Sequence, residues 1–424
     1  MKNVIIIGAG LAGLNAARLL AAHGLTVEVF ERRATVGGRV RTRTVDGFTV
    51  DRGFQVLFTN YPAARSALDY PALDLRRFTP GAIIASPGHR TMLSDPRRDP
   101  GGAIASVRNP AVSPGDIYRA IRLWFHLRTT PGEEIFPGPD QSIEAYLEEW
   151  GFSQSLIDDF IRPFYGGITL DRSLSTAAAV FEYTAKMLLE GDIAVPASGM
   201  GAIPKQLAHS AREAGATITT GTTIKTVEVT AAQDGVTVDA EGDCYRAGAA
   251  IVATDPPTVR ELTDNLSIPS SGRSCVTQYY ALPSAVDLET EGRLVLNATA
   301  DGPNQISPMS TVAPEYAPPG QQLLAATYLG ESPSDDEVLE SQTRQTLESW
   351  YPDRSWNELT SIHTDRIRFA QFDQPPGSHA RLPRADDPAG PIYLAGDFTR
   401  WSSIQGALES GQVAADTVLR SFDA

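Results

Sequence analysis

The chain has few of the residues from which disulfide frameworks, metal centres and hydrolytic sites are built. Its two cysteines, Cys244 and Cys275, cannot form a disulfide framework or a cysteine cluster, which is typical of a reducing cytoplasm. Six scattered histidines show no spacing that would bring two of them onto one metal ion. A Gly-x-Ser-x-Gly motif is also missing. These absences argue against a metal site and against the common hydrolases.

Lysine and long apolar runs are scarce as well. The lysines are Lys2, Lys186, Lys205 and Lys225, and arginine supplies nearly all other basic charge. A formal net charge of −15 argues against nucleic acid and against an anionic membrane as the main partner. Beyond the first 25 residues no apolar run reaches membrane length, so we expect no stable membrane span and a cytoplasmic protein.

The remaining composition is that of a globular protein, with 42% hydrophobic and 21% charged residues. A chain of 424 residues exceeds the size of one ordinary core, so two domains are expected.

The stretch MKNVIIIGAGLAGLNAARLLAAHGLTVEVFE is apolar enough for a signal peptide or a membrane span, but its pattern favours a third interpretation. β-branched residues predict a buried parallel strand at 4–7, followed by a helix that ends at Gly24 and a second strand at 26–30. Arg18 would interrupt the core of a signal peptide or lie in lipid. We therefore predict a strand–helix–strand unit.

Glycines at fixed spacing make this unit a candidate dinucleotide site. Gly8 allows a tight turn, Gly10 lets a pyrophosphate approach the backbone, and Gly13 lets the helix pack closely on the strand. The helix N-terminus presents free N–H groups to the phosphates. Glu31, followed by Arg32, lies where the fingerprint has its ribose-binding acid. The predicted loop residues are Gly8, Gly10, Leu11, Ala12 and Gly13.

Two more segments follow in the N-terminal region. Gly37-Gly38 is succeeded by Arg39 a few residues beyond the ribose-type glutamate, where bound phosphates should lie. Residues 45–50 predict a hairpin that turns at Asp46-Gly47. Short strands and loops are expected from 62 to 110, with one strand at 81–85.

The pattern becomes helical between residues 113 and 189. The string DIYRAIRLWFHLR predicts a helix with Ile117, Ile121, Trp124 and Leu127 on one face. A basic amphipathic helix of this kind could lie on a membrane. We favour packing of this face against the helix's own domain.

The chain then returns to the first sheet and leaves it again. A helix and an alternating strand within 195–230, followed by VTVDA and CYRAGAAIVAT, are expected to bring the chain back to the first sheet. Residues 266–384 predict further strands and one helix at 335–350. The C-terminal PIYLAGD predicts a buried strand and a Gly-Asp turn, followed by a helix.

The chain contains an ordered set of motifs: the dinucleotide fingerprint, Glu31, Gly37-Gly38-Arg39, a central ATD, and LAGD followed by SIQGALESG. This set resembles the flavin-containing amine oxidoreductase superfamily, which includes amine oxidases, protoporphyrinogen oxidases and phytoene-type desaturases. The resemblance implies non-covalent FAD, because FAQFDQPPG has no cysteine where covalent members carry one. It also implies that the start of the last helix stabilises negative charge on a reduced flavin.

The resemblance assigns roles residue by residue. Gly8, Gly10 and Gly13 match the pyrophosphate loop, and Glu31 matches the ligand of the adenosine ribose. Gly38 and Arg39 match the groups that lie beside the pyrophosphate. Gly53-Phe54-Gln55 matches the segment that runs against the flavin ring, and Ile224 matches the residue whose backbone meets the adenine. Gly396-Asp397 matches the pair at the ribityl and phosphate region, and Ile404 to Ala407 the helix start at the flavin pyrimidine. Gln55, Trp401 and Ser403 are the candidate substrate-facing residues.

The resemblance leaves the substrate open. Ser403 stands where amine oxidases usually have a cage aromatic, and no lysine lies in the context that holds a water at the flavin. The string SIQGALESG is somewhat closer to the desaturase and protoporphyrinogen oxidase branch. Catalytic residues are not assigned.

We therefore expect an α/β fold in which a doubly wound FAD domain is interrupted by a mixed α+β substrate domain. The FAD domain is predicted at 1–75, 190–265 and 385–424, and the substrate domain at 76–189 and 266–384, helical at about 113–189.

The predicted function is hydride transfer from a small-molecule substrate to flavin N5, with an amine as substrate. The alternative is desaturation of an isoprenoid or tetrapyrrole C–C bond. A flavin-free binding protein like the Rab GDP-dissociation inhibitors, which share the fold, is a further alternative. The expected electron acceptor is oxygen or a quinone.

Overall fold

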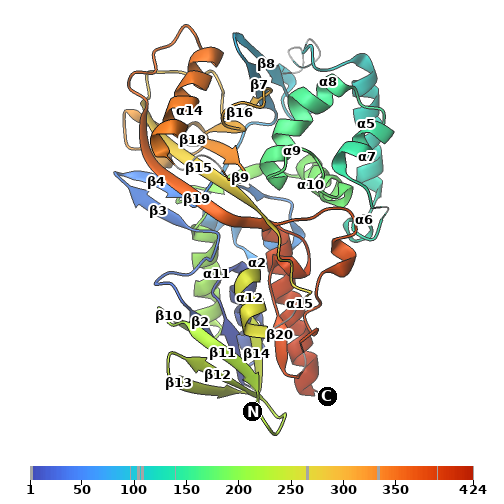
Figure 1. Ribbon diagram of the computed structural model, residues 1–424, viewed down its shortest axis with the longest axis vertical. Coiled ribbons are helices and arrows are strands. Elements are labelled where there is room, and N and C mark those ends of the chain that lie inside the picture. The colour runs from blue at the N-terminus through green and yellow to red at the C-terminus, as the bar shows by residue number, and fades with distance from the viewer. Residues whose placement is uncertain are drawn as a thin grey trace.

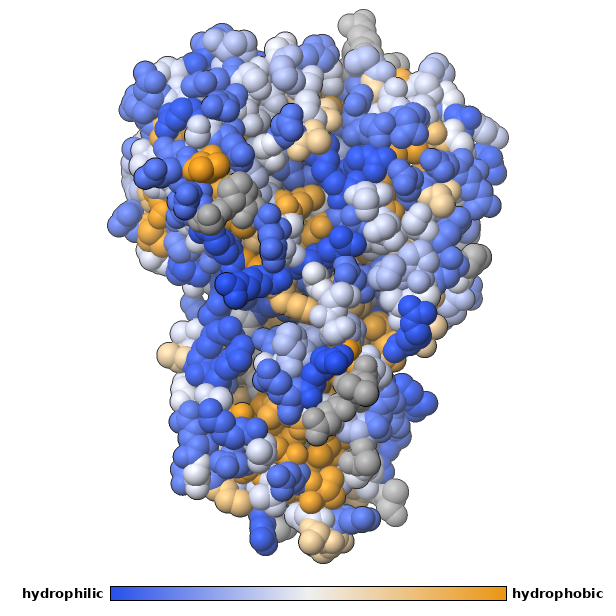
Figure 2. Space-filling view, viewed as in Figure 1, coloured by the Kyte–Doolittle hydropathy of each residue, from blue (hydrophilic) through white to orange (hydrophobic). Residues whose placement is uncertain are grey.

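A computed structural model describes residues 3–95, 97–102, 106, 109–138, 140–263, 267–331, 335–388 and 390–423. The molecule is elongated, with a lower lobe around both chain ends and a larger upper lobe (Figure 1). The space-filling view narrows between the lobes, and strongly hydrophilic side chains lie at this narrowing (Figure 2).

The lower lobe is built on the N-terminal strand–helix–strand unit, as predicted. It consists of β1 (Asn3–Ile7), α1 (Leu11–Ala22) and β2 (Thr26–Glu31), and the two strands pair in parallel. Three more parallel strands complete the order β10-β2-β1-β14-β20: β10 (Thr217–Thr220), β14 (Ala249–Val252) and β20 (Ile392–Leu394). Because β1 is the middle strand and buried, its apolar run is explained by the sheet.

Both faces of this sheet are covered. Val4 and Ile6 face one core with α1, α11 (Ala202–Glu213) and α15 (Ile404–Asp423). Ile5 and Ile7 face a second core with an antiparallel sheet, as period-2 alternation requires. That sheet is formed by β11 (Ile224–Val229), β12 (Val236–Ala240) and β13 (Asp243–Ala247). The helix α12 (Pro256–Thr263) follows β14.

The upper lobe contains a seven-stranded sheet in the order β19-β15-β18-β17-β16-β7-β8. Its strands are β7 (Ala82–Ser86), β8 (His89–Leu93), β15 (Gly272–Pro283), β16 (Leu294–Asn297), β17 (Gln305–Pro308), β18 (Gln321–Leu329) and β19 (Thr360–Phe372). The helix α14 (Asp336–Trp350) packs on it through Leu339, Leu347 and Trp350. The long strands β15 and β19 descend to the junction between the lobes (Figure 1).

Smaller elements connect the lobes. The predicted hairpin is formed by β3 (Thr42–Val45) and β4 (Phe48–Asp51). A three-stranded sheet joins β5 (Leu57–Phe58), β9 (Ile193–Pro196) and β6 (Leu75–Arg77). Short helices are α2 (Pro62–Ala67), α3 (Tyr70–Leu73) and α13 (Met309–Val312).

A helical layer occupies the other side of the upper lobe, as the helical periodicity predicted. It contains α5 (Pro114–Thr129), α6 (Gly132–Ile135), α7 (Ile143–Glu149), α8 (Gln154–Leu156), a π-helical turn (Ile157–Ile161), α9 (Arg162–Thr169) and α10 (Ala178–Glu190). In Figure 1, α9 and α10 lie on the inner side of this layer and α5 on its outer edge.

The buried face of α5 agrees with the predicted one only in part, because Leu127 is buried and Trp124 half-buried as expected, but the two isoleucines are not. Leu123 and Leu127 enter the core of the helical layer, whereas Ile117 and Ile121 are 40% and 51% exposed. The helix has two apolar stripes, centred about 140° apart around the helix axis, and the periodicity alone does not say which one is buried. Asp116 decides the orientation, because its carboxylate is buried and accepts hydrogen bonds from Ser113 and Ser153.

The architecture confirms the predicted fold class, a doubly wound parallel sheet combined with a mixed α+β part. The domain boundaries stay a proposal. Within the described residues, no helix combines the length and apolar character that crossing a membrane requires.

Candidate active site

A cavity of about 800 Å³ lies between the lobes. Its lower side is formed by the residues that follow β1, β2, β14 and β20, at the carboxyl ends of these parallel strands. Open α/β sheets bind ligands at this edge. We call this part the sheet end of the cavity.

The structure brings nearly all predicted site residues to this cavity. The predicted residues that line it are Gly8, Gly10, Leu11, Ala12, Glu31, Arg32, Gly38, Arg39, Gly53, Phe54, Gln55, Ile224, Gly396, Asp397, Trp401, Ser403, Ile404 and Ala407. Gly13 does not line it.

The three glycines of the first loop have separate structural reasons. Gly8 has a φ of +107°, and a Cβ there would lie 2.6 Å from the carbonyl oxygen of Ala253. A Cβ on Gly13 would lie 2.1 Å from the carbonyl oxygen of Gly8, so close packing of α1 on the strand requires glycine. A Cβ on Gly10 would meet no protein atom within 4 Å. Only Gly10 therefore leaves room for something other than the protein.

Glu31 is held in place at the end of β2. Its buried carboxylate accepts hydrogen bonds from the backbone N–H groups of Ala9 and Arg33, both at 2.9 Å. Arg32 turns outward and pairs with Asp255 at 3.1 Å. The carboxylate of Glu31 is thus oriented by the same loop that contains the glycines.

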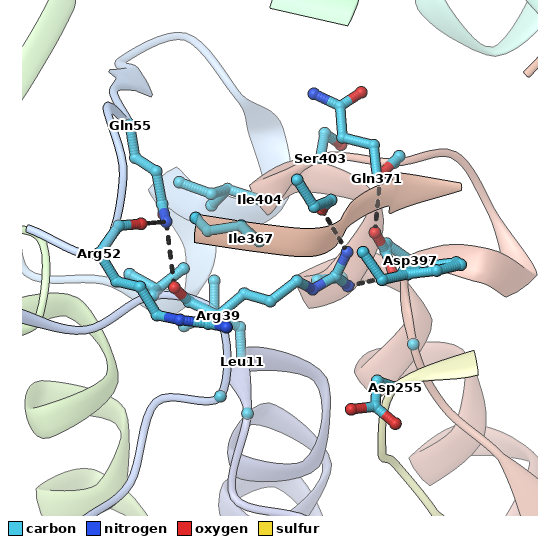
Figure 3. A pocket seen from close by; sticks show the side chains of 18 of the residues that line it. Leu11, Arg39, Arg52, Gln55, Asp255, Ile367, Gln371, Asp397, Ser403 and Ile404 are labelled. Carbon is cyan, nitrogen blue, oxygen red and sulfur yellow. Dashed lines mark hydrogen bonds and ion pairs between the residues drawn. The ribbon is translucent and has the colours of Figure 1, made fainter. Parts of the chain in front are cut away.

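Arg39 crosses the cavity from the Gly37-Gly38 turn (Figure 3). Its guanidinium pairs with the carboxylate of Asp397 at 2.5 Å and donates to the carbonyl of Ala370 at 3.0 Å. Burial opposes the charge of Arg39, but Asp397 outweighs it, so the pKa of Arg39 is raised above its usual value. Asp397 also accepts a hydrogen bond from Ser402. This pair fixes the C-terminal turn to the N-terminal loop.

The segment Gly53-Phe54-Gln55 passes along the cavity wall. The Gln55 side chain donates to the carbonyls of Arg39 and Arg52, at 3.0 and 2.9 Å (Figure 3). Gly53 has a φ of +75°, and a Cβ there would lie 2.7 Å from Ile367. The amide of Gln55 is therefore used to shape the backbone, and its N–H donors are not free for a substrate.

Two helix N-termini face the cavity. One belongs to α1, and the other to the 20-residue α15, whose first residues Ile404 and Ala407 line the wall. Ser403 caps α15, because its side-chain oxygen accepts the N–H of Gly406 at 2.7 Å. Both N-termini favour a negatively charged group close to their free N–H groups.

Additional arginines raise the positive charge at the sheet end. Arg33 and Arg52 also line the cavity, and Arg41 lies close to both. Burial and the neighbouring guanidinium groups lower the pKa of Arg52, and they lower that of Arg41 to about 10. Sequence reasoning missed these arginines, although all lie within 20 residues of Glu31 or Gly38.

The other side of the cavity is predominantly apolar, and we call it the apolar end. It is lined by Phe54, Val56, Phe58, Tyr61, Phe164, Ile168, Leu170, Val180, Ile193, Leu294, Leu296, Ile367 and Trp401. Its polar side chains include Thr184, Gln305 and Gln371. Most of these residues were missed, because they come from α9, α10, β9, β16 and β19 and share no motif.

No carboxylate among the described residues lies at the apolar end. The acidic residues that line the cavity are Glu31, Asp255, Glu261 and Asp397, all from segments of the sheet end. Cys275 also lines the cavity, and burial raises the pKa of its thiol to about 11, so it is protonated at neutral pH.

Trp401 belongs to a buried aromatic group. Its ring lies 5.1 Å from that of Tyr183, 5.6 Å from Phe136 and 6.0 Å from Tyr61. Of these, Trp401 and Tyr61 line the cavity.

One lysine of the described residues lines the cavity, and it lies beside the predicted adenine residue. Lys225 lines the cavity beside Ile224, whereas Lys186 binds the carbonyl of Leu127 and the carboxylate of Glu190. No group of three or more His, Cys, Asp and Glu residues in the described part of the chain could hold a metal ion.

Comparison with known proteins identifies the family. The sequence model described as "Flavin containing amine oxidoreductase" matches residues 11–419. The chain belongs to this family. The family-level prediction made from the ordered motifs is confirmed.

Two relatives of the chain are named for different substrates. A phytoene dehydrogenase from Streptomyces griseus is 28% identical over 256 residues, which is 54% of this chain and 49% of that protein. A putrescine oxidase from Kocuria rosea is 52% identical over 54 residues, 13% of this chain and 11% of that protein. The chain thus matches about half or less of the length of these relatives.

The fold extends over the whole chain. An oxidoreductase from Methanosarcina mazei superposes with a TM-score of 0.74 at 19% identity, covering 99% of this chain and 100% of that one.

The site fits the flavin dinucleotide of this family. Gly10 leaves open space beside a helix N-terminus, Arg39 and Arg52 supply positive charge, and Glu31 is an oriented acceptor. These are the features that a pyrophosphate and a ribose require.

Proposed function

We propose that the protein is an FAD-dependent oxidoreductase that oxidises a C–H bond of an apolar substrate of the isoprenoid or tetrapyrrole type. This is the alternative that the sequence left open beside an amine. The observation that carries the proposal is the apolar end of the cavity, whose lining has no carboxylate in the described residues. A hydrocarbon gains free energy there, whereas an ammonium group would be buried with no carboxylate to balance its charge.

In this proposal the sheet end holds the cofactor. The residues assigned to the cofactor are Gly8, Gly10, Leu11, Ala12, Glu31, Arg39, Gly53, Phe54, Ile224, Gly396, Asp397, Ile404 and Ala407, of which Phe54 also borders the apolar end. FAD, when bound, supplies the acceptor for a hydride from the substrate. The chain positions the cofactor, excludes water through the apolar lining and favours negative charge at the start of α15. Oxygen or a quinone then takes up the electrons.

An amine is the second candidate. It is supported by the aromatic rings of Trp401 and Tyr61 in the cavity wall, since aromatic faces attract cationic and amine groups. The two chemistries differ at one residue: replacing Trp401 by leucine should abolish amine oxidation and leave oxidation of a hydrocarbon nearly unchanged.

The test is an anaerobic titration of the purified yellow protein with three kinds of compound: amines, isoprenoid hydrocarbons in micelles, and porphyrinogens. Loss of the visible flavin absorbance reports hydride transfer. Bleaching by a hydrocarbon or porphyrinogen, but not by amines, is expected. Bleaching by amines alone contradicts the proposed substrate, and a protein that binds no flavin contradicts the enzyme itself.

A further inference from the structure

The outer face of α5 carries an unusual concentration of exposed apolar side chains. Among the described residues, five large hydrophobic side chains are exposed, and four of them lie on this helix. They are Ile117 at 40%, Tyr118 at 63%, Ile121 at 51% and Phe125 at 57%. Because Ile117, Ile121 and Phe125 are each four residues apart, they form one continuous stripe.

The charged side chains that α5 exposes are all basic. They are Arg122 and Arg128, with His126 beside them, and the only acid of the helix, Asp116, is buried. The whole chain has a net charge of −15, so this face is a local exception. A negatively charged surface would repel the rest of the molecule and attract this face, which would orient the protein.

The cations are placed beside aromatic rings. Arg122 lies 5.9 Å from the ring of Tyr118, and Arg97 and Arg128 lie 5.2 and 5.3 Å from that of Trp124. Aromatic rings and snorkelling arginines are the side chains that suit the boundary between lipid headgroups and acyl chains.

The inner face of α5 is fixed to the protein. Leu123 and Leu127 are buried in the core of the helical layer, and the carbonyl of Leu127 accepts a hydrogen bond from Lys186 at 2.8 Å. The outer stripe therefore cannot rotate inward. The helix α5 lies at the outer edge of the upper lobe (Figure 1).

We propose that the outer face of α5, formed by Ile117, Tyr118, Ile121, Arg122, Phe125 and Arg128, docks on a lipid bilayer with anionic headgroups. The apolar stripe enters the interface and the arginines contact the headgroups. This inference goes beyond the proposed function and does not depend on which substrate is oxidised.

The experiment is flotation of the purified full-length protein with vesicles. One set contains equal parts of phosphatidylglycerol and phosphatidylcholine, and the other contains phosphatidylcholine alone. We expect the wild type to float with the anionic vesicles and much less with the neutral ones. Wild-type protein that stays at the bottom with anionic vesicles overturns the proposal.

Two variants test the residues. Ile121→Glu combined with Phe125→Glu should reduce partitioning at least about tenfold, because both side chains leave the interface. Arg122→Gln combined with Arg128→Gln should reduce it roughly tenfold to thirtyfold on anionic vesicles and leave neutral vesicles unaffected.

The matched control is Val338→Glu on α14, because Val338 is 40% exposed, like Ile117. It should float as the wild type does. Equal loss in this control, or full flotation of the Ile121/Phe125 variant, overturns the proposal. A third outcome is that the wild type binds no vesicles and forms a dimer, whereas the Ile121/Phe125 variant is a monomer. This result would overturn the lipid proposal and assign the face to a second copy of the chain. Unchanged thermal unfolding shows that each variant is folded.

Discussion

At the sheet end of the cavity, short segments that follow parallel strands supply both backbone and side-chain groups. The apolar end, in contrast, is lined by single side chains that lie far apart in the sequence. Gly8, Glu31 and Asp397 each lie at or just beyond the end of a parallel strand, and the partners of Glu31 are backbone groups. At the apolar end, Ile168 lies on α9, Val180 on α10 and Leu296 on β16.

This contrast indicates which part of the site tolerates change. Phosphate and ribose groups need fixed donors and acceptors, so the sheet end depends on backbone geometry that few residues permit. A hydrocarbon needs only an apolar volume of suitable shape, which many side chains provide. We therefore expect substitutions at the sheet end to affect cofactor binding and those at the apolar end to affect substrate choice.

The largest effect is expected for Gly10→Val. Its side chain would project into the open space beside the α1 N-terminus and exclude the pyrophosphate, so FAD affinity should fall by at least about 100-fold while the apoprotein stays folded. Flavin fluorescence titration measures the affinity. The contrasting variant is Gly13→Val, which should destabilise the apoprotein, because its Cβ would clash with the carbonyl of Gly8. If Gly10→Val purifies fully yellow, the sheet end is not the cofactor site.

A second large effect, on the pH dependence of stability, is expected for Asp51. This residue lies two positions before the segment Gly53-Phe54-Gln55, which passes along the cavity wall. Its carboxylate is buried and accepts hydrogen bonds from Thr42, from Tyr316 and from the N–H of Met200. Burial raises its pKa from 3.8 to about 6 despite these bonds.

The sign of the resulting pH dependence follows from proton binding. Between pH 4 and 6 the folded state holds a proton on Asp51 that the unfolded state has lost, so this contribution to stability falls as pH rises. Relative to Asp51→Asn, the free energy of unfolding of the wild type should drop by at most roughly 3 kcal/mol between pH 4 and 7. Urea unfolding of both proteins across this range measures the difference. A difference that is constant with pH would contradict the raised pKa.

A smaller effect, confined to substrate choice, is expected for Ile168→Asp. A carboxylate at the apolar end should lower kcat/KM for an apolar substrate by at least about tenfold, because it keeps water in the cavity. The FAD affinity should stay within about twofold, since α9 does not contribute to the sheet end. Ile168→Asn is the control for volume without charge. Equal losses in both variants would mean that shape, and not charge, selects the substrate.

The smallest effect is expected for Ser403→Ala. The substitution removes the cap of α15 and should cost about 1 kcal/mol of unfolding free energy. The backbone N–H groups at the start of α15 remain, so flavin binding should weaken only slightly. Chemical denaturation and flavin titration measure the two effects, and a severe loss of flavin would show that the Ser403 side chain binds the cofactor directly.

The positions of the sheet-end residues followed from local pattern. Strand, glycine loop and helix lie within 31 residues, and their periodicities and turn residues predict the unit without distant contacts. The same holds for Gly396-Asp397 before α15. What the pattern did not predict is that Arg39 and Asp397 form an ion pair, since 358 positions separate them.

The orientation of α5 shows the limit of periodicity in another way. Its sequence contains two apolar stripes, and both are compatible with a buried face. Asp116 accepts hydrogen bonds from Ser153, which lies outside α5, and this contact fixes the rotation of the helix. In that rotation Leu123 and Leu127 are buried, whereas Ile117 and Ile121 are exposed.

Local sequence was sufficient to establish the parallel βαβ unit, the glycine and acid positions of a dinucleotide site and, through the order of the motifs, the family. These features depend on backbone conformation and spacing within short segments, and spacing is written in the sequence. The side chains that line the apolar end and the stripe of α5 that stays exposed became known only from the folded molecule. Those outcomes depend on packing between distant segments of the chain, and an apolar residue in a sequence does not say which neighbour will cover it.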